Sequence, residues 1–470
     1  MPYRAPVEDF AFLFDHVVGL DAVRQTDRFE DASEDVTRAI LEEAGKMTND
    51  VLAPLQRAGD LTPAKLENGV VRTSPGFADG FKAVAEGGWI GMSADPEFGG
   101  MGLPMTLTTA VNEMMSGACL SLQLAPLMSQ GQIEALEHHA SDAIKELYLP
   151  KLISGEWTGT MNLTEPQAGS DVGALATKAE DNGDGTYAIS GQKVYITWGD
   201  NDFGGNICHL VLARLPGAPA GTKGISLFLV PKYLPNDDGS LGNANSLKVV
   251  SLEHKLGIHG SPTCVMQYDK ATGWLVGPEQ GGMAAMFTMM NNARINVGNQ
   301  GVQIGERATQ QATDYAAERI QSARAGSGDK QPVAILEHPD VRRMILRMKA
   351  LTEGMRALLY YTAGQTDRGT APRQERLLKR AFFLWCEFPH HEPRTEDPPS
   401  GNGRLICGRP PPGKDVVRFF ADRMKADGIQ PRKGEREGGT IAILVSRLRA
   451  IQDRRRGSIH IRTCRRVACK

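Results

Sequence analysis

The sequence predicts an α+β protein of several domains: an N-terminal helical domain over residues 1–157, a central β-barrel or β-sandwich over 158–280, and a C-terminal helical bundle over 281–380. Two observations predict this order. Apolar residues recur at helical spacing in the first and third segments, whereas the middle segment is rich in β-branched and aromatic residues between Gly, Asn and Asp turns. Because strands and helices do not alternate, the order excludes a nucleotide-binding Rossmann domain.

The length and composition are those of a multidomain globular protein. With 470 residues the chain is long enough for two or three cores, since one core rarely grows beyond roughly 250–300 residues. No apolar stretch approaches the roughly 18–20 residues of a membrane helix, and the N-terminus does not have the pattern of a secretory signal. The seven cysteines lack paired metal-ligand spacing. We therefore expect a cytoplasmic protein with no membrane span and no metal site.

In the first domain, Val36, Ile40, Met47 and Val51 fall near helical spacing, which predicts an amphipathic helix from about residue 35 to 55. Two more helical segments follow, PGFADGFKAVAEGG and the long run from TLTTAVNEMM to ALEHH. The glycines of EFGGMG predict a plain turn rather than a phosphate-binding loop, because no strand precedes them.

The third domain returns to the helical period. A helix is expected from about Met283 to Ala323, and a second one begins near His338 after the turn-like run AGSGDKQP. On the second helix an apolar stripe predicts packing in a bundle. The stripe consists of Val341, Met344 or Ile345, Met348, Leu351, Met355 and Leu358.

The chemistry is expected at the start of the β-domain. The run LTEPQAGSDVGA at 163–174 is rich in hydroxyls and small residues, and VYITWG follows with Tyr195 and Thr197 beside a glycine turn. A flat redox-active heterocycle needs an aromatic wall against one face and neutral donors at its edge, and the two segments can supply both. From the residues alone, a polar turn leading into a strand is the alternative interpretation.

The motif TEPQAGSD at 164–171 resembles the signature of the acyl-CoA dehydrogenase family. The similarity continues through GGWIGMSADPEFGGMGLP, VYIT, KLGIHGSPTCVM and the helix from MNNAR to AAERIQ, and covers roughly residues 35–380. The amino-acid sequence of the β-domain is most similar to that of the subgroup that acts on 3-(methylthio)propanoyl-CoA. The resemblance implies an FAD-dependent α,β-dehydrogenation of an acyl-CoA thioester, with hydride transfer to flavin N5.

The resemblance also implies which residues form the site. FAD would be bound by Leu163, Thr164, Gly169, Ser170, Tyr195, Thr197 and Arg319, and the substrate by Ser170 and Arg294. Thr164 would meet the pyrimidine edge of the flavin, Tyr195 would lie against its ring, and Thr197 would donate toward N5. Arg319 would reach the pyrophosphate in a neighbouring subunit of a homo-oligomer; a solvated helix charge is the alternative. Electrons would pass to an electron-transfer flavoprotein.

The catalytic base is unknown. The family supplies a glutamate from a Tyr-Glu-Gly-Thr stretch late in the bundle, or from the position before Arg294, which here is Ala293. Neither glutamate is found, so we expect the chain to be weakly active or inactive. Glu437, in EREGGTIAIL, is a weak candidate because Glu-Gly-Gly-Thr echoes the missing motif.

The similarity stops near Arg380, which leaves the bundle incomplete. Residues 1–380 carry 34 Lys and Arg against 45 Asp and Glu, whereas residues 381–470 carry 19 against 10, with eight of the 27 prolines and four of the seven cysteines. Our hypothesis is a change of reading frame near this point, and we expect a disordered or poorly folded basic tail. The tail shows no recognisable nucleic-acid-binding fold, and the spacing of His390 and His391 from the cysteines fits no standard metal site.

Two other functions stay open. One is a non-catalytic remnant that binds FAD or acyl-CoA, and the other is a flavin oxidase or monooxygenase on the same scaffold. Flavin reduction by acyl-CoA separates the first from a dehydrogenase, and rapid reoxidation by air identifies the second.

Overall fold

The structure is a computed structural model that describes residues 3–369 except 325, 327 and 329. The predicted tail over 381–470, with Glu437 and the histidines at 390 and 391, lies outside the described residues. In the described part of the chain, no helix is both long and apolar enough to cross a membrane. No group of His, Cys, Asp and Glu side chains there is arranged to hold a metal ion.

The N-terminal part is helical, as expected. Its helices are α1 (Val7–Leu13), α2 (Asp21–Arg24), α3 (Glu34–Met47), α4 (Leu55–Leu61), α5 (Phe77–Glu86), α6 (Met105–His139) and α7 (Asp142–Ile153), with a short hairpin of β1 (Lys65–Glu67) and β2 (Val70–Arg72). Ser33 caps α3 by accepting a hydrogen bond from the Val36 N–H at 3.3 Å. The helix predicted from about 35 to 55 is therefore present, and it continues as a π-helical turn over Thr48–Leu52.

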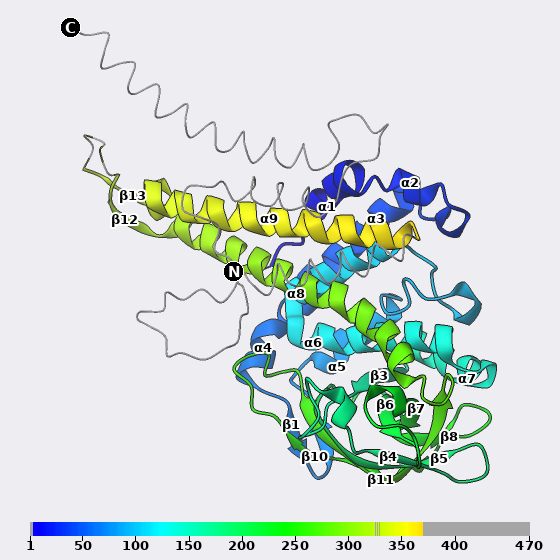
Figure 1. The fold of residues 1–470 in the computed structure, drawn as a ribbon. Coiled ribbons are helices and arrows are strands. Elements are labelled where there is room, and N and C mark those ends of the chain that lie inside the picture. The colour runs from blue at the N-terminus through cyan, green and yellow to red at the C-terminus, as the bar shows by residue number, and fades with distance from the viewer. Residues whose placement is uncertain (1–2, 325, 327, 329, 370–470) are drawn as a thin grey trace, which may run out of the picture.

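The helix α6 is bent in its middle. Cys119 has φ −150° and ψ 86°, outside the helical range. The two halves remain in contact, because Asn112 on the first half donates to Gln130 on the second at 2.9 Å. In Figure 1, α6 lies above the β-domain, α8 (Gly282–Glu318) rises past it from the β-domain, and α9 (Pro339–Asp367) lies on the far side of both.

The middle of the chain is a β-barrel with flanking strands. It contains β3 (Trp157–Asn162), β4 (Lys178–Asp181), β5 (Tyr187–Thr197), β6 (Asn206–Arg214), β7 (Ile225–Pro231), β10 (Leu247–Leu252) and β11 (Thr263–Val276), plus a separate hairpin of β8 (Tyr233–Pro235) and β9 (Leu241–Ala244). The main sheet runs β10-β11-β5-β4-β6-β3, and β7 pairs with both β11 and β6. This pairing closes β11, β5, β4, β6 and β7 into a ring. The predicted order of helical, β and helical parts is confirmed.

The last described part contains α8, a hairpin of β12 (Ile320–Ala323) and β13 (Pro332–Ala334), and α9. The helix expected to reach Ala323 ends at Glu318 instead. Arg319 leaves the helical range at ψ 112°, and its carbonyl accepts a hydrogen bond from the returning Ile335 N–H at 2.7 Å. Strand pairing therefore replaces the last helical turn.

The buried face of α9 differs from the predicted apolar stripe. Met344 is 45% exposed, and the other predicted stripe residues are half-buried. The buried face carries Arg356 instead, whose guanidinium binds Glu113 on α6 at 2.7 Å and Glu306 on α8 at 3.0 Å. Asp367, in the last turn of α9, accepts the N–H bonds of Met105 and Thr106 at 2.6 and 2.9 Å and so caps α6. Polar contacts therefore fix α9 to both neighbouring helices.

Candidate cofactor and substrate site

The loop after β3 lies against the end of β5. The Val194 N–H donates to the Thr164 carbonyl at 2.9 Å. Glu165 and Ala168 exchange two backbone hydrogen bonds of 3.0 Å, which makes a tight turn and brings Gly169 back toward Thr164. A Cβ atom on Gly169 would lie 3.8 Å from Thr164 Cγ2. The two segments singled out by the sequence therefore meet at one edge of the barrel.

A buried ion pair holds this loop in place. Glu165 Oε1 accepts from Lys193 Nζ at 2.8 Å and from the Thr177 hydroxyl at 2.6 Å, while Oε2 accepts from the Ala176 N–H at 2.7 Å. Burial opposes ionisation of Glu165, but the Lys193 ammonium and these hydrogen bonds outweigh it and lower the pKa of the carboxyl to about 2. Burial lowers the pKa of Lys193 to about 8, although Glu165 acts in the opposite direction. The Glu165 carboxylate therefore stays charged near neutral pH and stabilises the loop instead of transferring protons.

A β-bulge turns Tyr195 outward. On β11, Cys264 pairs with Ile196 and Met266 pairs with Lys193, so Val194 and Tyr195 together oppose the single residue between them. Tyr195 has φ +62°, a left-handed conformation that is rare for an aromatic residue. Its side chain is 64% exposed. Strained backbone of this kind clusters at binding sites, and here it presents an aromatic ring beside the loop.

Trp198 fastens the end of β5 to the helical part. Its indole N–H donates to the Ser121 carbonyl, just after the bend in α6, at 3.1 Å. The ring is 1% exposed and packs near Phe77 and Phe203. Trp198 is therefore a core residue, and Tyr195 is the aromatic side chain that faces outward.

Several polar groups on the loop and at the end of β5 are free. The hydroxyls of Thr164, Ser170 and Thr197 have no hydrogen-bond partner among the described residues, and neither does the Thr164 N–H. Thr164 and Thr197 are half-buried, and Ser170 is exposed. By contrast, the hydroxyl of Thr177, further along the same loop, is bound by Glu165. Unpaired neutral donors next to an exposed ring are what the edge of a flat heterocycle requires.

Of the other predicted site residues, Arg294 lies on α8 and Arg319 directly follows the end of that helix. Arg294 is half-buried, donates to Asn291 at 2.6 Å and lies over the Phe287 ring at 5.4 Å. Arg319 is exposed at the C-terminal end of the same helix. The helical rise of 1.5 Å per residue separates the Cα atoms of these arginines by roughly 40 Å. Arg319 therefore does not belong to the same local site as Arg294.

The sequence analysis missed a seam of buried amides between α6 and α8. The α8 residues Asn292, Asn296, Asn299 and Gln303 are each at most 5% exposed. Asn292 binds Glu134, Asn296 accepts from Asn112, and Asn299 donates to the Thr109 carbonyl. The amide atoms of Gln303 have no partner among the described residues. Their spacing of four, three and four residues, the period of a buried helix face, was a signal in the sequence.

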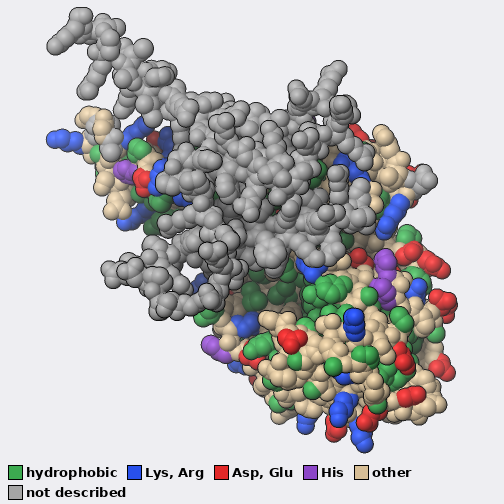
Figure 2. All heavy atoms as spheres, in the orientation of Figure 1, with side chains coloured by type: hydrophobic (Ala, Val, Ile, Leu, Met, Phe, Trp, Pro, Cys, Tyr) green, Lys and Arg blue, Asp and Glu red, His purple; other side chains and the backbone are tan. Residues whose placement is uncertain are grey.

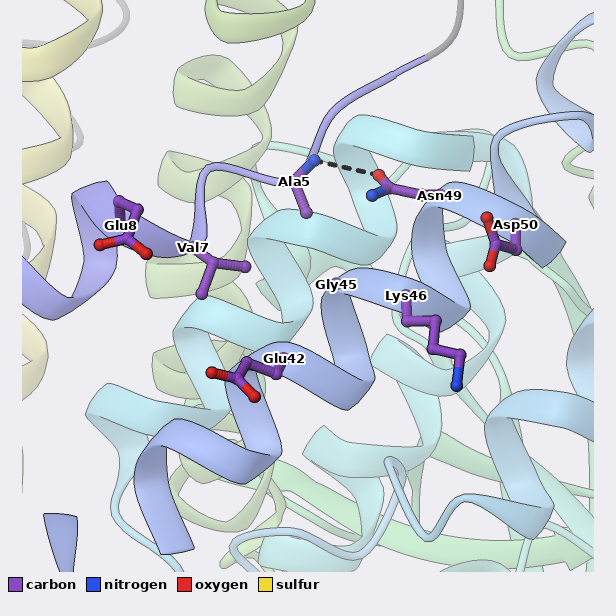
Figure 3. A pocket seen from close by; sticks show the side chains of 8 residues that line it. All are labelled: Ala5, Val7, Glu8, Glu42, Gly45, Lys46, Asn49 and Asp50. Atoms are coloured by element: carbon purple, nitrogen blue, oxygen red, sulfur yellow. Dashed lines mark hydrogen bonds between the residues drawn. The ribbon is translucent and has the colours of Figure 1, made fainter. Parts of the chain in front are cut away.

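A shallow pocket elsewhere in the helical part does not qualify as the site. Figure 3 shows it between the N-terminal segment and α3, with Glu8, Glu42, Lys46 and Asp50 along its walls. The Ala5 N–H donates to Asn49 there at 3.0 Å. Its charges are of mixed sign, and no aromatic ring lines it. Figure 2 likewise shows acidic and basic side chains interspersed over the visible face of the β-domain.

Comparisons with known proteins identify the family of the chain. Models of the acyl-CoA dehydrogenase N-terminal, middle and C-terminal domains match residues 34–156, 160–271 and 280–382. A 3-methylmercaptopropionyl-CoA dehydrogenase of Ruegeria pomeroyi is 49% identical over 367 residues, which are 78% of this chain and 62% of the relative. A butyryl-CoA dehydrogenase of Syntrophomonas wolfei is 38% identical over 374 residues, which are 77% of this chain and 61% of the relative. The chain thus spans about three fifths of the length of these relatives.

A solved structure shows the same fold. The three-dimensional structure of butyryl-CoA dehydrogenase from Megasphaera elsdenii is 21% identical and has a TM-score of 0.61. The match covers 74% of this chain and 85% of that one.

Proposed function

The chain belongs to the acyl-CoA dehydrogenase family of oxidoreductases, and on that basis we propose that it binds FAD at the edge of the barrel and acts on an acyl-CoA thioester there. The resemblance identified from the motif TEPQAGSD is confirmed. FAD is the cofactor of this family. The observation that carries the proposal is the contact between the loop at 163–174 and the bulged end of β5, two segments that together carry free donors and an exposed tyrosine.

The residues present fit FAD. We propose that Leu163 and Thr164 line the pyrimidine edge, that Tyr195 covers one face of the ring, and that Thr197 donates toward N5. The free hydroxyls and the free Thr164 N–H support these roles, because they are neutral donors without another acceptor. Gly169 and the exposed Ser170 lie on the same loop, where a small residue allows close approach of a ligand. When bound, FAD supplies an acceptor for the hydride that leaves the β-carbon of the thioester.

Binding of FAD and acyl-CoA does not require the catalytic base, whereas turnover of the thioester does. Removal of the α-proton needs a carboxylate base whose pKa is matched to the task. The position before Arg294 is Ala293, which has no ionisable group, and Glu437 lies outside the described residues. We propose that the chain binds FAD and acyl-CoA but turns over weakly or not at all. Arg294 is proposed as a substrate contact, since it is the charged side chain next to that position.

The proposed thioester is 3-(methylthio)propanoyl-CoA. The relative at 49% identity bears that substrate in its name, whereas the one at 38% is named for butyryl-CoA. The test is anaerobic mixing of the FAD-loaded chain with each thioester while the visible absorbance of the flavin is followed over time. Bleaching that is faster with the methylthio substrate supports the proposal. Loaded protein that no acyl-CoA bleaches favours the non-catalytic remnant, and immediate return of the absorbance in air favours an oxidase or monooxygenase.

Arg319 supports a homo-oligomer. Its side chain is exposed, makes no hydrogen bond or ion pair with the described residues, and lies roughly 40 Å from Arg294, the substrate contact proposed for its own chain. We propose that it binds the FAD pyrophosphate in a second copy of the chain. Sedimentation of the FAD-loaded protein tests whether the chain forms an oligomer. Arg319→Ala should weaken FAD binding without changing the fold of the monomer, which titration with FAD and circular dichroism measure. An electron-transfer flavoprotein as acceptor and a cytoplasmic location complete the proposal.

The division of the chain also remains a proposal. We place boundaries near residues 157, 280 and 380, with a basic tail over 381–470. Limited proteolysis followed by mass spectrometry tests it, since cleavage should concentrate near these positions.

A further inference from the structure

Lys193 binds the peptide group that carries the free Thr164 N–H. Its ammonium donates to the Leu163 carbonyl at 3.0 Å and to Glu165 Oε1 at 2.8 Å. The Leu163 carbonyl and the Thr164 N–H belong to one planar peptide unit. The ammonium therefore acts on one end of this unit, while the other end has no acceptor among the described residues.

A cation at the carbonyl end strengthens the donor at the other end. Charge-assisted hydrogen bonds polarise the group that they reach, and chains of hydrogen bonds reinforce one another. The effect is larger where water is excluded, and the Lys193 side chain is completely buried. Glu165 opposes the loss of the lysine charge in this interior.

Fold stability alone does not account for this ion pair. Replacing a buried ion pair by apolar residues of similar volume is often neutral or stabilising. The loop is also joined to β5 by the Val194 N–H, which donates to the Thr164 carbonyl at 2.9 Å. Besides its ion pair with Glu165, Lys193 adds the contact with the Leu163 carbonyl, which bracing of the loop does not require.

We propose that Lys193 is a positioning residue that polarises the Leu163–Thr164 peptide, so that the Thr164 N–H binds reduced FAD more tightly than oxidised FAD. This inference rests on the proposed function, in which Thr164 meets the pyrimidine edge of the flavin. Reduction adds two electrons to the flavin and increases the negative charge at that edge. A stronger donor there favours the reduced form and raises the reduction potential.

The test separates polarisation from bracing. If Lys193 only braced the loop, its loss would weaken the binding of oxidised and reduced FAD equally and leave the potential unchanged. We expect Lys193→Met to weaken the binding of reduced FAD about tenfold more than that of oxidised FAD, which is about 30 mV of lower potential for a two-electron couple. Lys193→Arg, which keeps a cation, should retain most of the wild-type potential.

The experiment uses the full chain loaded with FAD, titrated against a dye of known potential. Lys232→Met is the matched control, because Lys232 pairs with the buried Asp200 at 2.6 Å in the same β-domain; its potential should equal that of the wild type. If Lys193→Met does not fold, the double variant Glu165→Gln/Lys193→Met removes both charges and should show the same loss. An unchanged potential in Lys193→Met, or in the double variant if that one is needed, would overturn the inference.

A second readout needs no cofactor. The amide proton of Thr164 in the FAD-free protein should resonate at lower frequency in Lys193→Met than in the wild type, because its N–H is less polarised. An unchanged resonance would overturn the inference even if FAD binds as proposed. A wild-type chain that takes up no FAD would instead refute the proposed function, while a shifted resonance would leave the polarisation itself standing.

Discussion

The carboxylate of Glu165 lies 2.8 Å from the ammonium of Lys193, and both side chains are withdrawn from solvent. The pair joins the loop after β3 to the strand that carries Tyr195 and Thr197. The Glu165 carboxylate, with a pKa of about 2, stays charged near neutral pH. The role of the pair is to hold free donors and an exposed ring at fixed positions, which is the preorganisation that a cofactor site requires.

Breaking this pair on one side should be costly. Glu165→Gln leaves the Lys193 ammonium buried without its counter-charge, and we expect a loss of about 3–5 kcal/mol in the free energy of unfolding. Glu156→Gln is the control, since Glu156 pairs with Lys151 at 2.8 Å but is 51% exposed; it should cost less than about 1 kcal/mol. Urea unfolding measures both. Equal effects of the two substitutions would contradict the buried-pair account.

The same pair predicts an acid-dependent loss of stability. The carboxyl of Glu165 has an ordinary pKa of 4.5, and folding lowers it to about 2. Its contribution, about 3 kcal/mol for this shift, is complete above pH 4.5 and is lost as the pH falls toward 2. The stability difference between the wild type and Glu165→Gln should therefore shrink over this range. A difference that stays constant from pH 6 to pH 3 would argue against it.

Tyr195 should be better tolerated as glycine than as alanine. Its left-handed backbone is strained for any residue with a Cβ atom, so Tyr195→Gly should be more stable than Tyr195→Ala by about 1 kcal/mol. Tyr187, on the same strand without this conformation, is the control. There glycine should be less stable than alanine by about 0.5–1 kcal/mol. The same order of stability at both positions would mean that the bulge is absent in solution.

The amide seam on α8 should respond unevenly to apolar substitution. Gln303 is buried and has no partner among the described residues, so Gln303→Leu should raise the free energy of unfolding by about 1–2 kcal/mol. Asn296→Leu should lower it by about 1–3 kcal/mol, because it removes an acceptor of Asn112. Thermal unfolding measures both. A destabilised Gln303→Leu would indicate that water or a ligand binds this amide.

The sequence was sufficient for the order of the helical, β and helical parts, because the spacing of apolar residues is a local property. It was not sufficient for Lys193. Regular alternation places Lys193, Tyr195 and Thr197 on one face of a strand, whereas the bulge opposite β11 buries the lysine and exposes the tyrosine. A bulge depends on the register between two distant strands, which no local pattern encodes.

The face of α9 was missed for a similar reason. Its apolar stripe was predicted to be the buried side. In the structure a different side is buried, and it carries Arg356, which is bound there by Glu113 and Glu306. These partners come from two other helices. A buried arginine can be recognised only once the positions of both glutamates are known.

We infer that the Thr164 and Thr197 hydroxyls bind FAD at this edge of the barrel, and the dissociation constant of FAD measures their contribution. The wild-type chain should bind FAD and become yellow, and Thr164→Val and Thr197→Val should each weaken binding roughly fivefold, as expected for one lost hydrogen bond of about 1 kcal/mol. Thr186→Val, which removes a hydroxyl that binds Asp184 in another turn of the β-domain, should leave the constant unchanged. A colourless wild-type protein, or three variants that all bind FAD as the wild type does, would contradict the account.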